Sequence, residues 1–197
     1  MQFTSELIEL RTAHAFNIAR EDAPPARTSV WLTVRDAEGR EGWGEAAANA
    51  FYGETAETVL AILPRLEAAA EAAADGDPFA LERIEEAIAR SVAGNPSARS
   101  ALSAALHDLV GKRLGVPVWK LWGLDPAAAP LSSFTIGIDD LTVMRDKVRE
   151  ASAYPILKIK VGGARDEEIL RMIREEAPDK TVRVDANTGW TAKQAIR

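Results

Sequence analysis

The stretches Pro155-Ile-Leu-Lys-Ile-Lys-Val161 and Lys180-Thr-Val-Arg-Val-Asp185 decide the fold of this chain. The first is a short, mainly apolar run, the second is a short segment that ends in Asp185, and both have the length of a β-strand. Residues 165–177, which lie between them, have the apolar spacing of an amphipathic helix. Two strands joined by one helix form a βαβ unit, whose strands run parallel. We therefore expect a parallel sheet in this part of the chain.

Charged residues at the ends of these two strands indicate a functional site. Side chains alternate across a strand, so Lys158 and Lys160 share one face, and Asp185 ends the next strand. Burying such groups is costly, which favours a functional role over chance. The structural alternative is a solvated sheet face on which Asp185 only caps the following loop.

The residue types at this site indicate a particular chemistry. A lysine that is desolvated beside a second cation has a lowered pKa and can act as a general base near neutral pH. A carboxylate at the end of the neighbouring strand can hold Mg²⁺, which prefers oxygen ligands. The combination predicts abstraction of a proton next to a carboxylate, with the metal ion stabilising the enolate.

Composition narrows the class of protein. The chain has 197 residues, 47% of them hydrophobic, and a net charge of −6 with a sequence pI near 5.1. An acidic chain without a basic run is not expected to bind nucleic acid or an anionic membrane. We find no apolar stretch of transmembrane length and no signal-like N-terminus. Cysteine is absent, which excludes disulfides and thiolate chemistry and fits a cytoplasmic location.

The first part of the chain has the pattern of a small α+β unit. We predict strands at residues 3–11, 28–35 and 41–46, with a hairpin turn at 36–39 and a loop at 17–26 containing Pro24-Pro25. Helices are predicted at residues 55–74, 78–93 and 96–114, with a short helical turn at 118–121. Asn95, Pro96 and Gly115 fit the N-cap, the first helical position and the residue after the end of the third helix.

The pattern changes at residues 125–130, which we take as the domain boundary. After it we expect a strand at 132–138, a helix at 140–153, and then the βαβ unit described above. Thr191 has the properties of an N-cap for a further helix, which is interrupted at Arg197. Three strands without a closing partner would leave unpaired outer edges.

Several motifs carry a resemblance to a known family. Leu157-Lys-Ile-Lys-Val161 and Val184-Asp-Ala-Asn-Thr-Gly-Trp190 resemble the enolase superfamily in its muconate-lactonizing branch. Gly42-Trp-Gly-Glu-Ala46 is a further match. Within that branch, Phe51-Tyr-Gly-Glu-Thr55 and Ser133-Phe-Thr-Ile-Gly137 are most similar to dipeptide epimerases of the Ala-Glu type.

The resemblance implies a fold and an activity. Residues 1–125 would form an α+β capping domain, and residues 126–197 the truncated beginning of a modified TIM barrel, the (β/α) barrel of the family. The implied protein is an isomerase, a Mg²⁺-dependent epimerase that removes the α-proton of a dipeptide or related carboxylate. A cycloisomerase or an o-succinylbenzoate synthase of the same branch is the alternative.

The resemblance also implies roles for residues on the two barrel strands. Lys160 would be the acid/base lysine, and Lys158 would support the substrate carboxylate and lower the pKa of Lys160. Asp185 would be the first of three carboxylate ligands of the metal ion. Asn187 belongs to the motif but receives no role as a ligand.

Three further residues would contact the substrate. Arg20, in a loop that caps the barrel mouth in the family, would pair with a substrate carboxylate; a surface role is about equally expected. Thr135 would reach the substrate from the first barrel strand, although a strand threonine often reflects only β-propensity. Tyr52 would line the pocket from the second capping loop, with ordinary packing as its alternative.

Parts of the family's active site have no counterpart in these 197 residues. The family places two more metal carboxylates and a second lysine on later strands. We therefore expect the chain alone to be inactive. The alternative from another class is a non-catalytic half-barrel that binds a partner through its open edge. The expected partner is otherwise a small-molecule substrate, and a homo-oligomer is left open.

Overall fold

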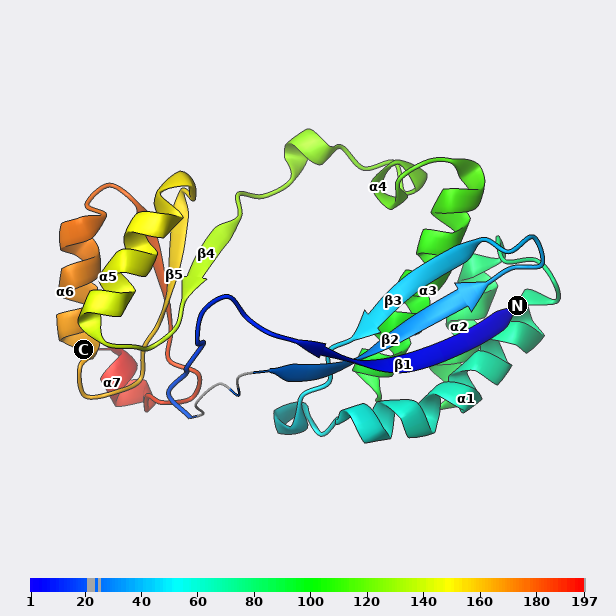
Figure 1. Ribbon diagram of the computed structural model, residues 1–197, viewed down its shortest axis with the longest axis horizontal. Helices are drawn as coiled ribbons and strands as arrows, with labels where there is room; N and C mark the ends of the chain where they lie inside the picture. Colours follow the sequence, from blue (N-terminus) through cyan, green and yellow to red (C-terminus); the bar gives the residue numbers. More distant parts are fainter. Residues whose placement is uncertain (21–23, 25, 197) are drawn as a thin grey trace. The chain divides into compact units, whose positions relative to one another are not determined.

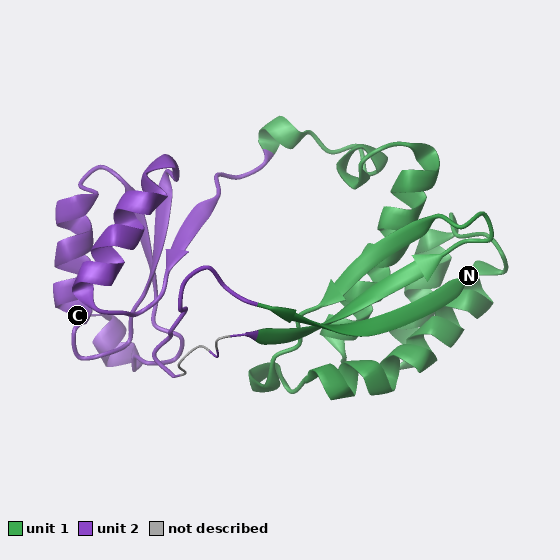
Figure 2. Cartoon of the chain, in the orientation of Figure 1, with its two compact units in different colours: residues 1–10, 27–128 green, residues 11–26, 129–197 purple. Residues whose placement is uncertain are grey.

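The described residues form two compact units (Figure 2). The computed structural model describes residues 1–20, 24 and 26–196, so Pro25 of the predicted loop and Arg197 lie outside the described residues. One unit consists of residues 1–10 and 27–128, and the other of residues 11–26 and 129–197. The N-terminal loop therefore groups with the C-terminal part of the chain.

The first unit is a three-stranded antiparallel sheet covered on one face by helices (Figure 1). The strands lie in the order β1-β2-β3, and β2 is the central strand because it pairs with both others. Alternating residues Val30, Leu32 and Val34 of β2 are fully buried in one core with residues of the helices. The elements are β1 (Gln2–Leu10), β2 (Arg27–Arg35), β3 (Glu41–Ala46), η1 (Ala50–Tyr52), α1 (Ala56–Ala74), α2 (Leu81–Ser91), α3 (Pro96–Leu114), α4 (Val118–Leu121) and η2 (Pro126–Ala128).

Helix ends in this unit follow local chemistry. Thr55 forms a capping box at the start of α1. Gly115 follows the end of α3, as predicted, and has the left-handed conformation. Asn95 is the N-cap residue of α3, as predicted, but its side chain makes no capping hydrogen bond. Asn95 itself has a left-handed backbone, and its side chain donates to the carbonyl of Ala93 instead. Pro96 nevertheless occupies the first helical position, as expected.

Two glycines explain the Gly42-Trp-Gly44 motif. A Cβ atom at Gly42 would overlap the carbonyl oxygen of Ala105, and one at Gly44 would overlap that of Ala101. Strand β3 therefore lies with its backbone directly against helix α3. Only glycine allows so close an approach.

The second unit is a parallel sheet in the order β4-β5-β6, which confirms the predicted βαβ arrangement. Helices α5 and α6 lie on one face (Figure 1), where Ile136, Leu157 and Ile159 form a core with apolar residues of these helices. The elements are β4 (Ser133–Ile136), α5 (Leu141–Glu150), η3 (Ala151–Ala153), β5 (Ile156–Lys160), α6 (Asp166–Glu176), β6 (Thr181–Asp185) and α7 (Ala192–Ile196).

The α+β arrangement followed by parallel strands and helices is thus the fold predicted from the sequence. Within the part of the chain that the structure describes, no helix is both long and apolar enough to span a membrane.

Candidate active site

The candidate site lies on the sheet face of the second unit that is opposite to its helices. Leu157 and Ile159 are fully buried in the core beneath the helices. Because side chains alternate along β5, Lys158 and Lys160 point to the other face. Lys160 pairs in register with Asp185 at the carboxyl end of β6, so the two side chains lie next to each other. The predicted juxtaposition of the three charged residues is therefore present.

Both lysines contact the same carboxylate oxygen. Asp185 Oδ2 lies 3.0 Å from Lys158 Nζ and 2.9 Å from Lys160 Nζ. Lys160 Nζ also donates to Asn187 Oδ1 at 2.8 Å. Only 9% of the Lys160 side chain is exposed, against 37% for Lys158. Lys160 is thus the buried ammonium group of the pair, and two oxygen acceptors hold it in place.

The surroundings of Asp185 favour its charged form. Hydrogen bonds from Lys160 and Lys158, followed by one from the backbone N–H of Asn187, hold the pKa of this carboxyl well below its usual range. The Asn187 N–H donates to Oδ1 at 2.9 Å, and Asn187 has a left-handed backbone, with φ of 45°. That turn directs both its N–H and its side-chain oxygen toward the site, which asparagine tolerates better than most residues. Asn187 is a functional candidate that sequence reasoning left without a role.

The N-terminal loop contributes to the burial of Lys160. The ring centre of Phe16 lies 5.7 Å from Lys160 Nζ, within range of a cation–π interaction. The next residue, Asn17, exchanges hydrogen bonds with Ile138, since the Ile138 N–H donates to Asn17 O at 2.9 Å and Asn17 Nδ2 donates to Ile138 O at 3.3 Å. Gly137 makes room for this contact, because a Cβ there would lie 3.0 Å from the Asn17 nitrogen.

The remaining predicted site residues are distributed over both units. Thr135 of β4 is the register partner of Lys158 and so lies on the same sheet face. Arg20 is half-buried in the loop that belongs to the second unit. Tyr52 belongs to the first unit and is 73% exposed. Contact of these three residues with a substrate stays a prediction.

The described residues do not by themselves form a magnesium site. Among them, no group of three or more His, Cys, Asp or Glu side chains has the geometry to hold a metal ion. Asp185 presents a single carboxylate, and both its oxygens already accept hydrogen bonds. Mg²⁺ requires about six oxygen ligands, so one engaged carboxylate is an incomplete set.

Comparison with known protein families shows to which family the chain belongs. The family model for the N-terminal domain of mandelate racemase / muconate lactonizing enzyme matches residues 6–123, and the model described as enolase C-terminal domain-like matches residues 143–197. An α+β unit followed by parallel strands that carry a lysine pair and an aspartate is the arrangement that the resemblance to the enolase superfamily implied. The chain belongs to the mandelate racemase / muconate lactonizing enzyme family of that superfamily.

Similar proteins within the family include dipeptide epimerases. The L-Ala-D/L-Glu epimerase of Bacteroides thetaiotaomicron is 37% identical over 198 residues, which cover 98% of this chain and 49% of that protein. The crystal structure of a dipeptide epimerase from Enterococcus faecalis, complexed with Mg and L-Leu-L-Tyr, has a TM-score of 0.84 at 28% identity and covers 99% of this chain and 55% of its own.

A solved muconate lactonizing enzyme from Pseudomonas fluorescens, complexed with muconolactone, has a TM-score of 0.87 at 26% identity, with 100% of this chain and 55% of that chain covered. The chain therefore spans about half the length of the relatives that it matches. The two motif-bearing strands and the capping unit lie within that shared half.

Proposed function

We propose that this chain is the N-terminal part of a Mg²⁺-dependent dipeptide epimerase, which inverts the configuration at a carbon next to a carbonyl group. The observation that carries the proposal is the buried Lys160 ammonium beside Asp185, at the carboxyl ends of two neighbouring parallel strands. Catalytic groups gather at this end of the strands in barrel enzymes. Similarity to an L-Ala-D/L-Glu epimerase and to a dipeptide epimerase supports the substrate class.

Lys160 is the proposed acid/base group. It is held by two acceptors and largely shielded from water, so its Nζ has a defined position from which to take a proton from a substrate carbon. Lys158 lies one layer lower on the same face and is more exposed, which suits contact with a substrate carboxylate. Asp185 is the proposed first metal ligand.

The support for Mg²⁺ in this proposal comes from proteins that are similar to this chain. The dipeptide epimerase from Enterococcus faecalis is complexed with Mg and a dipeptide. Bound next to a substrate carboxylate, Mg²⁺ would stabilise an enolate. The described residues supply only one carboxylate for it, so we expect these 197 residues alone to be inactive and the longer protein to supply the remaining ligands.

The proposed domains are a capping domain of residues 1–125 and the beginning of a barrel at residues 126–197. Arg20, Thr135 and Tyr52 are proposed to contact the substrate. The guanidinium of Arg20 can form two parallel hydrogen bonds with a carboxylate, which suits an acidic residue in the dipeptide.

Exchange of the substrate α-proton tests the function. The full-length protein is incubated with L-Ala-L-Glu and Mg²⁺ in D₂O, and deuterium at the α-carbon is followed by NMR. We expect exchange in the wild type and a loss of at least about a hundredfold in Lys160→Met. Lys193→Met, which changes an exposed lysine of α7, is the matched control and should exchange at the wild-type rate.

A lactonizing activity is the second candidate, and the TM-score of 0.87 to the muconate lactonizing enzyme favours it. Its assay is the conversion of cis,cis-muconate to muconolactone by the same preparation. Lactone formation without dipeptide exchange would replace the epimerase proposal. An absence of both activities in the full-length protein would refute the assignment of Lys160 as an acid/base group for either substrate.

A further inference from the structure

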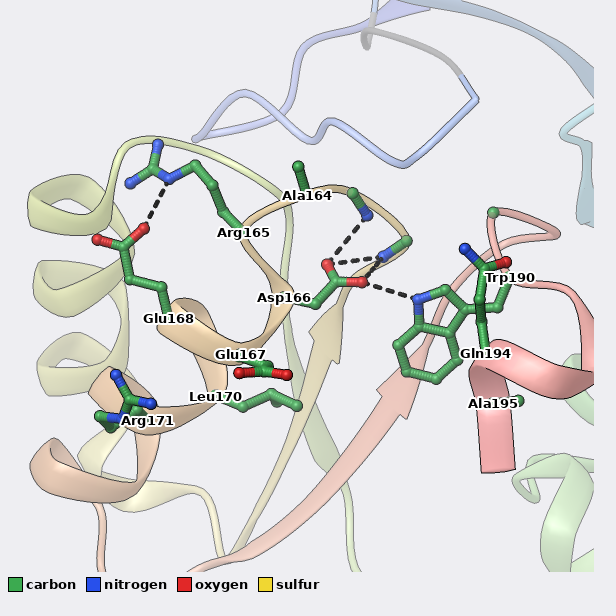
Figure 3. A pocket seen from close by; sticks show the side chains of 13 residues that line it. Ala164, Arg165, Asp166, Glu167, Glu168, Leu170, Arg171, Trp190, Gln194 and Ala195 are labelled. Atoms are coloured by element: carbon green, nitrogen blue, oxygen red, sulfur yellow. Dashed lines mark hydrogen bonds and ion pairs between the residues drawn. The ribbon is translucent and has the colours of Figure 1, made fainter. Parts of the chain in front are cut away.

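The carboxylate of Asp166 connects the two loops that follow the active-site strands (Figure 3). Asp166 is the first residue of α6, and its oxygens accept from the Gly162 N–H at 2.9 and 3.0 Å and from the Gly163 N–H at 3.0 Å. Oδ2 also accepts from the indole Nε1 of Trp190 at 2.7 Å. An aspartate that only begins a helix accepts from the N–H groups of its own helix. The two glycines and the tryptophan that donate to Asp166 all lie outside α6.

These donors are close in sequence to Lys160 and Asp185. Gly162 follows Lys160 by two residues, and Trp190 follows Asp185 by five. Between them, the Val161 N–H donates to the carbonyl of Asp185 at 3.1 Å and extends the strand pairing by one residue. The Asp166 carboxylate thus joins the segment after the lysine strand to the segment after the aspartate strand.

The two loops are in close contact where the carboxylate joins them. A Cβ atom at Gly162 would lie 2.7 Å from the carbonyl oxygen of Ala186, and one at Gly189 would lie 2.8 Å from the carbonyl oxygen of Gly162. Trp190 is partly buried and packs against the core of the second unit. Packing therefore holds the indole in place, and its hydrogen bond to Asp166 restrains the loop that follows β5.

From this arrangement we infer that Asp166 is a positioning residue for the proton-transfer site. It keeps the end of β5 against the Asp185–Trp190 segment, so that Lys160 Nζ stays between Asp185 Oδ2 and Asn187 Oδ1, at 2.9 and 2.8 Å. This inference rests on the proposed function, because it gives Asp166 a role in the placement of the proposed acid/base lysine. The hydrogen bonds that the Asp166 carboxylate accepts are of the stronger, charge-assisted type, because their acceptor is an ionised group.

Three variants of the full-length protein separate positioning from simple stabilisation. Asp166→Asn keeps the size of the side chain but replaces an accepting oxygen by a donor. Trp190→Phe removes only the indole N–H and keeps an aromatic ring, which provides a milder variant if Asp166→Asn fails to fold. Glu168→Gln is the control, because Glu168 lines the same pocket but its carboxylate pairs with the exposed Arg165 and not with either loop glycine.

The kinetic readout is the division of the effect between kcat and KM. We expect kcat for α-proton exchange to fall about tenfold in Asp166→Asn and about threefold in Trp190→Phe, with KM within about twofold, because misplacement of a reacting group slows the chemical step. Glu168→Gln should match the wild type. Wild-type kcat in folded Asp166→Asn and Trp190→Phe would overturn the inference.

A spectroscopic readout tests positioning without activity. In metal-free protein, an ammonium group held by two acceptors should give a resolved Nζ–Hζ NMR cross-peak for Lys160. We expect that cross-peak to broaden or disappear in Asp166→Asn and Trp190→Phe and to persist in Glu168→Gln. If it does so while the wild type lacks α-proton exchange, the proposed function fails and the positioning role stands. If it is unchanged in both variants, the positioning role fails whatever the activity.

Discussion

Replacement of Asp185 by asparagine should loosen the ends of β5 and β6 when no metal is bound. The change removes the carboxylate that touches both Lys158 and Lys160, which is the counter-charge of the buried Lys160 ammonium among the described residues. Breaking a fully buried ion pair costs about 3–5 kcal/mol, and breaking an exposed one about 0–1 kcal/mol. Lys160 is buried, but 29% of the Asp185 side chain is exposed, so we expect a loss of about 2 kcal/mol.

Native-state hydrogen exchange measures this loss locally. In the full-length protein with EDTA at pH 7, backbone amides of β5 and β6 should exchange about 30-fold faster in Asp185→Asn, since about 1.4 kcal/mol corresponds to a factor of ten. Asp146→Asn is the control, because the Asp146–Arg149 pair has side chains 70% and 61% exposed. Its exchange should change by less than about twofold. Equal exchange in Asp185→Asn and wild type would refute the argument that the carboxylate offsets the buried ammonium charge.

The stabilisation that Asp185 contributes should decrease as the pH falls. The pKa of Asp185 is lower in the folded protein than in the unfolded chain, so the unfolded chain binds the proton first as the pH falls. The stabilisation is therefore fully present above the unfolded pKa of about 4 and is lost progressively below it. The difference in the opening free energy of β5 and β6 between wild type and Asp185→Asn, measured by hydrogen exchange, should be constant from pH 8 to about pH 5. It should shrink below about pH 4.

Further predictions concern packing and specificity. Gly44→Ala should lower the free energy of unfolding by about 3 kcal/mol in thermal denaturation, because its methyl group would overlap the Ala101 carbonyl. Gly163→Ala, which has no atom of the described residues within 4 Å of its Cβ, should change it by less than about 0.5 kcal/mol. Lys180→Met should cost about 1–2 kcal/mol in urea unfolding, because Lys180 Nζ donates to three backbone carbonyls at 2.7–2.8 Å. If the proposed substrate contact is correct, Arg20→Ala should raise KM for L-Ala-L-Glu about tenfold more than KM for a neutral dipeptide; equal increases would remove the argument for an acidic substrate.

Local patterns were sufficient to predict most of the fold. The strand that carries Lys158 and Lys160 was identified because its apolar residues alternate with them, and alternation fixes the face of every side chain at once. Helix α3 was placed at residues 96–114, as observed, because proline and glycine mark its two ends. The predicted helix at 78–93 is shorter, at Leu81–Ser91. Asp77 accepts from the Phe79 N–H and forms a turn there, which competes with the first helical turn.

Contacts between distant segments were not predictable in the same way. The pairing of Asn17 with Ile138 joins residues 121 positions apart and brings the N-terminal loop to the second unit. The contact between Asp166 and Trp190 spans 24 residues and depends on the distance between two loops. No local periodicity reports such a distance. For the same reason, sequence reasoning found the charged pair at the strand ends but not the residues that hold it.

The glycine contacts between β3 and α3 also fix how far the helix can slide along the strand. Gly42 faces Ala105 and Gly44 faces Ala101, so the strand and the helix run in opposite directions at the contact. Two strand residues advance about 6.7 Å and four helical residues about 6 Å, so both glycines meet helix backbone at once. A helix displaced by one residue would bring side chains against the strand at both points. The alignment of β3 with α3 therefore depends on two positions without side chains at matched spacing. An added methyl group at either position would overlap the helix backbone and force the strand and the helix apart.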